Sequence, residues 1–222
     1  MGADDVFRRD VTDPQIRYET LFDPFTVFPE SRTDLVAIAA DRASAAGIEL
    51  SLRAPTRPKL NWWLSYSLSS VEDEVEGRTI KRSIDQTHAV TASLNWQPAK
   101  KWNLNWVAFH LTGWPTTPVA AEFVVPPDGD PFIHFEVGEF YSERWNDFQR
   151  IDFRASRTTE VGKDGTLTFF IDVQNLFNRD NQRGLEVTEP GFNQAGDGPT
   201  EVTFPVETWL PILPSFGVIW EF

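Results

Sequence analysis

The last seven residues, Phe216-Gly-Val-Ile-Trp-Glu-Phe222, carry the pattern that decides the fold of this chain. Their even-numbered positions hold Phe, Val, Trp and Phe, and their odd-numbered positions hold Gly, Ile and Glu. Successive side chains of a strand point to opposite faces. The segment therefore predicts a strand with one aromatic, apolar face and one small or polar face.

The same alternation recurs along the chain. No convincing amphipathic helix is found, and the 16 Pro and 13 Gly residues gather between the alternating runs. We therefore expect an antiparallel all-β fold of about seven or eight strands. The predicted strands are 35–53, 60–71, 87–97, 101–113, 147–161, 165–178 and 213–222, with a further strand at about 3–10.

The predicted connections alternate between short and long. The short ones are 54–59, 98–100 and 162–164, and the long ones are 11–34, 72–86, 114–146 and 179–212. Compact soluble domains rarely contain several long loops without structure of their own. Outer-membrane barrels have short periplasmic turns and long extracellular loops. The alternation therefore favours a transmembrane β-barrel over a β-sandwich.

The net charge of -13 argues against nucleic acid as a partner, because phosphate binding needs a basic surface. About two thirds of the acidic residues fall in the four long connections, which places negative charge at one rim of the predicted barrel. The chain contains no cysteine, which excludes disulfides, thiolate metal sites and cysteine catalysis. Apolar runs long enough for a transmembrane helix or a signal peptide are also missing from the sequence.

Tryptophans concentrate at the ends of predicted strands beside short turns. Trp62 and Trp63 follow one such turn, and Trp96 and Trp102 flank another. Indole prefers an interface between apolar and wet surroundings, so this placement predicts an aromatic girdle rather than a sandwich core. Trp114, at the exit of a strand before Pro115, is a further candidate. The expected interfacial anchors are Trp62, Trp96, Trp102 and Trp114.

Alternation also predicts which side chains of the barrel wall face lipid and which face the interior. The residues expected to face hydrocarbon are Leu94, Phe153, Ile171 and Val173. The residues expected to crowd the interior are Trp63, Arg150, Arg154 and Phe170.

Five segments and the C-terminus together resemble the C-terminal β-barrel part of a TonB-dependent outer-membrane receptor. The resemblance covers nearly all of residues 1–222, and the shared order and spacing carry it. The segments are Arg42-Ala-Ser-Ala-Ala-Gly-Ile-Glu-Leu50, Asp85-Gln-Thr-His-Ala-Val-Thr-Ala92, Gly113-Trp-Pro-Thr-Thr-Pro118, Arg150-Ile-Asp-Phe-Arg-Ala-Ser-Arg157, Phe170-Ile-Asp-Val-Gln-Asn-Leu-Phe-Asn-Arg179 and Gly217-Val-Ile-Trp-Glu-Phe222.

The resemblance implies uptake of a scarce ligand, such as an iron chelate, cobalamin or an oligosaccharide, across the outer membrane of a Gram-negative bacterium. Complete family members have about 22 strands around a plug domain. The plug and a signal peptide have no counterpart here, so the chain is expected to be a receptor fragment or a truncated product that closes a smaller barrel. Implied partners are outer-membrane lipid, the barrel assembly machinery, and the remaining barrel and plug through which TonB acts. The implied membrane insertion signal is Phe216, Val218, Trp220 and Phe222.

Motifs for catalysis or metal binding are weak. His88, His110 and His134 lack metal-ligand spacing, and no Gly-x-Ser-x-Gly elbow occurs. The acidic runs 72–76 and 128–130 fit solvated loop charge better than a calcium site. We therefore expect no enzymatic activity, no metal and no cofactor. Two alternatives remain: a soluble secreted β-sandwich that binds a carbohydrate or protein, and a self-sufficient small barrel with a structural role.

Overall fold

The computed structural model of the chain describes residues 2–21, 34–54, 57, 59–124, 126–127, 132–185 and 205–222. These residues form antiparallel sheets and contain no helix, which confirms the predicted all-β class. Within this part of the chain, no helix is available that could span a membrane.

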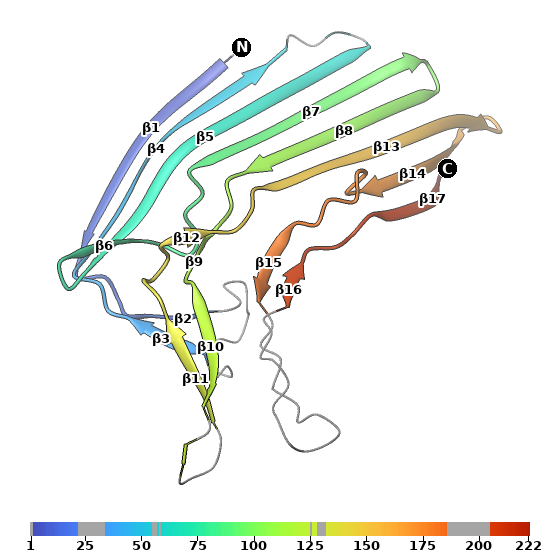
Figure 1. The fold of residues 1–222 in the computed structure, drawn as a ribbon. Helices are drawn as coiled ribbons and strands as arrows, with labels where there is room; N and C mark the ends of the chain where they lie inside the picture. The colour runs from blue at the N-terminus through green and yellow to red at the C-terminus, as the bar shows by residue number, and fades with distance from the viewer. Residues whose placement is uncertain are drawn as a thin grey trace.

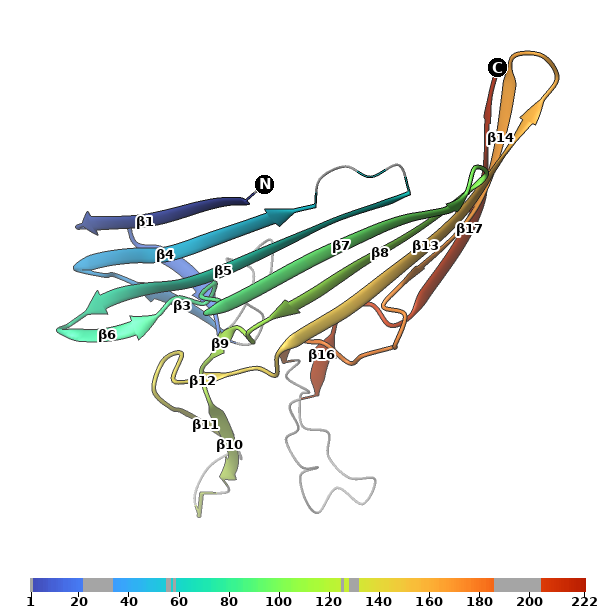
Figure 2. The same cartoon turned by 90° about the horizontal axis from the view of Figure 1, so that it is seen from above.

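One large sheet dominates the fold, in the order β1-β4-β5-β7-β8-β13-β14-β17, with β6 paired to β5 (Figure 1). It is twisted and curved, and β1 and β17 form its two edges (Figure 2). The described strands do not pair β1 with β17, so they form an open sheet rather than a closed barrel. The strands are β1 (Gly2–Thr12), β4 (Arg42–Arg53), β5 (Leu60–Val75), β6 (Arg78–Lys81), β7 (His88–Ala99), β8 (Trp102–Leu111), β13 (Phe148–Val161), β14 (Gly165–Gln174) and β17 (Leu213–Glu221).

The long connections contain hairpins, so the expectation that they lack structure of their own is wrong for their described parts. The hairpins lie at the end of the sheet opposite the short turns, and the ladder gives their backbone polar groups partners (Figures 1 and 2). The pairs are β2 (Arg17–Thr20) with β3 (Leu35–Ile38), β9 (Pro115–Thr116) with β12 (Glu143–Arg144), β10 (Val119–Val124) with β11 (Phe132–Val137), and β15 (Gln182–Leu185) with β16 (Val206–Thr208).

Turn chemistry explains the tight reversal between β5 and β6. Glu76 and Gly77 have φ values of 51° and 75° and join Val75 directly to Arg78 across the β5–β6 hairpin. Two central residues with positive φ match the twist of the flanking strands, and glycine adopts that conformation without strain.

Three predicted boundaries are wrong. The predicted strand 60–71 continues to Val75, because its last four residues pair with β6. The predicted strand 35–53 is interrupted at 39–41, because β3 turns away to pair with β2 and buries Ile38 and Ala40 there. The predicted strand 165–178 ends at Gln174, since Asn175 and Asn178 both have positive φ. The additional strand expected at about 3–10 is confirmed as β1.

Candidate functional site: the two faces of the sheet

Strand register brings the apolar positions of seven strands onto one surface, which we call the apolar face. One row of directly opposed residues crosses five strands: Trp62, Leu94, Trp106, Phe153 and Val173. Directly opposed residues of antiparallel strands share a face, so these five side chains lie on the same side. The remaining large members are Ile48, Leu50, Leu52, Leu60, Leu64, Tyr66, Leu68, Val90, Trp96, Trp102, Leu104, Ile151, Leu167, Phe169, Ile171, Phe216, Val218 and Trp220.

No other element covers the apolar face within the described part of the chain. Ile171 is 57% exposed and Phe216 is 88% exposed, although both belong to regular, paired strands. The buried hydrophobic residues among those described are Ile38, Ala40, Ala43 and Tyr141, none of which belongs to this face. Soluble monomers rarely expose apolar patches larger than a few hundred Å². The other described sheets have only two strands, so no second large sheet faces the first as in a β-sandwich.

Strand β1 departs from this pattern. On the side that it shares with the apolar face, β1 presents Val6 among Asp4, Arg8 and Asp10. Arg8 and Asp10 form an exposed ion pair of 2.8 Å. The apolar face therefore extends from β4 to β17 and gives way to charge at the β1 edge.

The four lipid-facing candidates, Leu94, Phe153, Ile171 and Val173, all lie on the apolar face. The four interior candidates lie on the opposite surface, which we call the polar face. The structure therefore confirms that the residues of each set share one face of the sheet. The interior candidates are Trp63, Arg150, Arg154 and Phe170.

Aromatic side chains of the apolar face gather near the short turns. Trp96 is opposed to Leu104, and Trp102 lies next to the β7–β8 turn opposite Ala99. Trp62 lies near the start of β5 on the same face, whereas Trp63 points to the polar face opposite Ser93. Register therefore places these two neighbouring tryptophans on opposite faces, as their alternation in the sequence predicts.

Trp114 lies at the other end of the sheet. It is partly buried, and its ring meets that of Phe148 edge-on at a centroid distance of 6.2 Å.

At the chain end, the rings of Trp220 and Phe222 are 5.7 Å apart, and Phe222 is 97% exposed. Phe216 and Val218 lie on the same side of β17 as Trp220, so the four residues of the expected insertion signal continue the apolar face to the terminus.

The polar face carries small polar side chains and two ion pairs. Arg150 and Asp152 are 2.9 Å apart within β13, and Arg154 contacts Asp172 of β14 at 3.3 Å. The Arg154 guanidinium also stacks over the Phe170 ring, at 4.1 Å from its centroid. The small polar members include Ser65, Ser67, Ser69, Thr91, Ser93, Asn95, Asn103, Asn105, Ser156, Thr158, Thr166 and Thr168.

Buried carboxylates bind arginines where the hairpins join the sheet. We call this group, formed by Arg17, Asp73, Arg82, Asp85 and Arg144, the junction cluster. The Asp73 carboxylate, which is fully buried, accepts hydrogen bonds from Arg17 at 2.6 Å and Arg82 at 2.9 Å. The Asp85 carboxylate binds Arg144 and accepts a hydrogen bond of 2.6 Å from the Val71 amide. These pairs satisfy charges that burial would otherwise make costly, so they fix how the hairpins leave the sheet.

Tyr141 extends the junction cluster. Its hydroxyl donates a hydrogen bond to Glu19 of β2, 122 residues away. Burial, reinforced by the negative charge of Glu19, raises the pKa of the Tyr141 hydroxyl above its usual range.

Sequence reasoning missed the junction cluster. It read the run 72–76 as solvated loop charge, but Asp73 and Asp85 are among the most deeply buried residues described. Arg17 lies 56 residues from Asp73, and Arg144 lies 59 residues from Asp85. No local sequence pattern indicates that these residues pair. Among the described residues, no group of three His, Asp or Glu side chains could hold a metal, and run 128–130 lies outside that part.

The side chains of two asparagines hydrogen-bond to the backbone after β14. The Asn175 carboxamide accepts a hydrogen bond from the Arg179 amide and donates one to the Arg179 carbonyl, both at 3.0 Å. The Asn178 carboxamide accepts a hydrogen bond of 2.8 Å from the Ile212 amide. The three histidines occupy strands β7, β8 and β11, and His88 Nδ1 is 3.0 Å from the Tyr66 hydroxyl oxygen.

No known protein family matches the chain, and none of the curated proteins matches it either.

Proposed function

We propose that this chain is part of the wall of a transmembrane β-barrel in the outer membrane of a Gram-negative bacterium. The apolar face would contact lipid and the polar face would line the interior. The uncovered apolar face from β4 to β17 is the observation that carries this proposal. In addition, Asp73 and Asp85 are buried while large apolar side chains are exposed. Proteins in water usually bury apolar side chains and expose charged ones.

The height of the apolar face supports a membrane position. Along β13, the apolar residues Ile151, Phe153 and Ala155 lie between Gln149 and Arg157. Those eight steps span about 26 Å along the strand, or about 20 Å of membrane thickness at a tilt of about 40°. The apolar band of outer-membrane barrels is about 25 Å tall, so the dimensions are compatible.

The open edges support a larger assembly. Lipid offers no hydrogen bonds to unpaired strand edges, so β1 and β17 would require further strands or another chain. By the resemblance in sequence, the parent would be a TonB-dependent receptor, with its plug and remaining strands as partners. Its ligand would be an iron chelate, cobalamin or an oligosaccharide. The barrel assembly machinery would recognise the C-terminal residues Phe216, Val218, Trp220 and Phe222. Deleting Phe222 from the parent should lower its amount in the outer membrane without changing the ligand affinity of inserted molecules.

Membrane insertion can be tested with the full chain refolded into lipid vesicles. Alkaline carbonate should leave the protein with the vesicles, and lipids brominated on the acyl chain should quench Trp fluorescence. Trp106→Phe should reduce that quenching more than Trp63→Phe, because Trp106 lies on the apolar face and Trp63 on the polar face. A chain that stays monomeric and soluble without detergent would overturn the proposal.

A further inference from the structure

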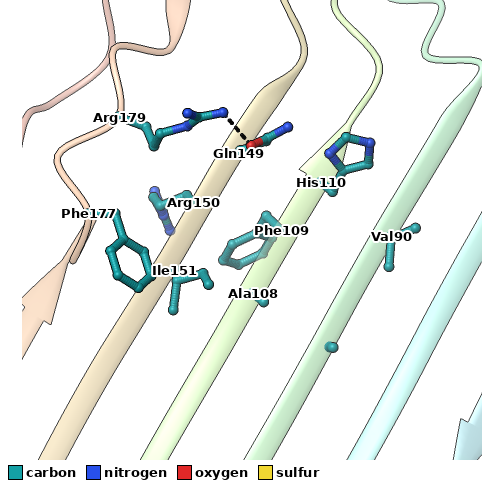
Figure 3. Close-up of a pocket in the computed structure, with 10 residues that line it drawn as sticks. Val90, Ala108, Phe109, His110, Gln149, Arg150, Ile151, Phe177 and Arg179 are labelled. Atoms are coloured by element: carbon teal, nitrogen blue, oxygen red, sulfur yellow. Dashed lines mark hydrogen bonds between the residues drawn. The ribbon is translucent and has the colours of Figure 1, made fainter.

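A hollow of ≈ 530 Å³ opens on the apolar face near the end where the hairpins leave the sheet. Its floor is formed by Ala92 and Ala108, which are directly opposed on β7 and β8. The larger side chains of Val90, Ile151 and Phe177 surround them, with Phe177 approaching from beyond β14 (Figure 3). Small residues between large ones leave a depression with an apolar lining.

One edge of this hollow is polar. The Arg179 guanidinium donates a hydrogen bond of 2.5 Å to the Gln149 side-chain oxygen, and His110 lies on the neighbouring strand (Figure 3). His110 is 3.8 Å from Asp147, whereas Arg179 has no carboxylate partner among the described residues. An exposed cation thus lies at the border between the apolar face and the polar hairpin end.

We infer that this hollow binds a lipid that carries an anionic phosphate headgroup, with one acyl chain over Ala92 and Ala108 and the phosphate on Arg179. The inference rests on the proposed membrane position of the sheet. The apolar lining suits a hydrocarbon chain, which needs no hydrogen bonds. The guanidinium suits phosphate oxygens, to which it can donate two parallel hydrogen bonds. Gln149 holds Arg179 at the rim through a neutral side chain, and no carboxylate of the described residues forms an ion pair with the guanidinium.

The test is native mass spectrometry of the full chain in detergent micelles that contain equimolar phosphatidylglycerol and phosphatidylcholine with identical acyl chains. Both lipids carry the phosphate, but the choline cation of phosphatidylcholine offsets its negative charge. We therefore expect phosphatidylglycerol adducts to exceed phosphatidylcholine adducts by about tenfold, as one charge-assisted interaction permits. Arg179→Gln should abolish the preference. Arg78→Gln removes the same charge at the tip of the β5–β6 hairpin, at the same end of the sheet, and should preserve it.

A second variant tests the hollow itself. Ala108→Leu fills its floor and should reduce adducts of both lipids, while Ala46→Leu, on the apolar face of β4 outside the hollow, should not. Equal adducts in the unaltered protein and the Arg179→Gln variant would overturn the lipid site. So would competition by soluble glycerol phosphate, which would show that the headgroup alone binds. A chain that enters micelles without lipid preference overturns this inference alone, whereas failure to enter them overturns the membrane proposal as well.

Discussion

The ring of Phe170 lies over the backbone of Gly217, its directly opposed partner on β17. A Cβ atom at Gly217 would be 2.6 Å from Cζ of Phe170, so only glycine leaves room for the ring in this position. Arg154 stacks on the same ring, which links three strands on the polar face. Phe7 and Gly47 repeat the arrangement between β1 and β4, with a corresponding distance of 2.6 Å. Each edge strand is therefore held to its neighbour by an aromatic ring over a glycine.

Gly217→Ala should displace Phe170 and weaken the attachment of β17. Overpacking of this kind costs about 1–3 kcal/mol, measured as the free energy of unfolding in micelles. Hydrogen exchange of the β17 amides should accelerate accordingly. Ser215→Ala, on the same face of β17, is the matched control and should change little. Because Phe170→Leu removes the ring, Gly217→Ala should cost much less in that background, and equal costs would contradict the packing argument.

Ile171→Arg places a charge on the apolar face, where Ile171 is opposed to Ala155 and Phe216. In a lipid-facing wall, Arg near the bilayer midplane costs about 2–4 kcal/mol, so the folded yield in vesicles should fall sharply. Asp172→Asn changes the adjacent residue on the polar face and should be tolerated, since the amide oxygen can still accept a hydrogen bond from Arg154. Equal yields of the two variants would argue against a lipid-facing wall.

Asp85→Ala removes the buried partner of Arg144 and leaves the Val71 amide without its acceptor. Breaking a buried pair costs about 3–5 kcal/mol, and the partial exposure of Arg144 favours the lower end of that range. The hairpin end should become sensitive to limited proteolysis. Arg8→Ala breaks an exposed, solvent-screened pair and should leave the free energy of unfolding nearly unchanged. Comparable protease resistance of both variants would show that Asp85 does not hold the hairpins.

Stability should depend on pH through Tyr141. The pKa of its hydroxyl is raised in the folded protein by burial and by Glu19, so folding favours the protonated form. Its contribution is fully present below about pH 10, the ordinary tyrosine value, and is lost as the pH rises above it. Tyr141→Phe should be less stable at neutral pH. Its free energy of unfolding should also fall less steeply than that of the unaltered protein as the pH rises above about 10. Tyr18→Phe, at a 56% exposed position, should retain the full decline in unfolding free energy. An unchanged alkaline profile in the Tyr141→Phe variant would exclude this role.

Period-2 alternation was enough to predict the all-β class, because it is a local property of each strand. It also placed the polar and apolar sides of β13, β14 and β17. It misplaced the boundary between β3 and β4, because the break at 39–41 depends on β2, a partner that local alternation does not reveal.

The amino-acid sequence by itself determined that strands such as β5, β14 and β17 have one apolar side and one polar side. Only the tertiary structure decided that these apolar sides form a single surface, since a one-residue change of register would turn any strand over. The junction cluster also depends on the tertiary structure. Asp85 and Arg144 lie 59 residues apart, and chain folding alone brings them into contact where burial makes each charge depend on the other.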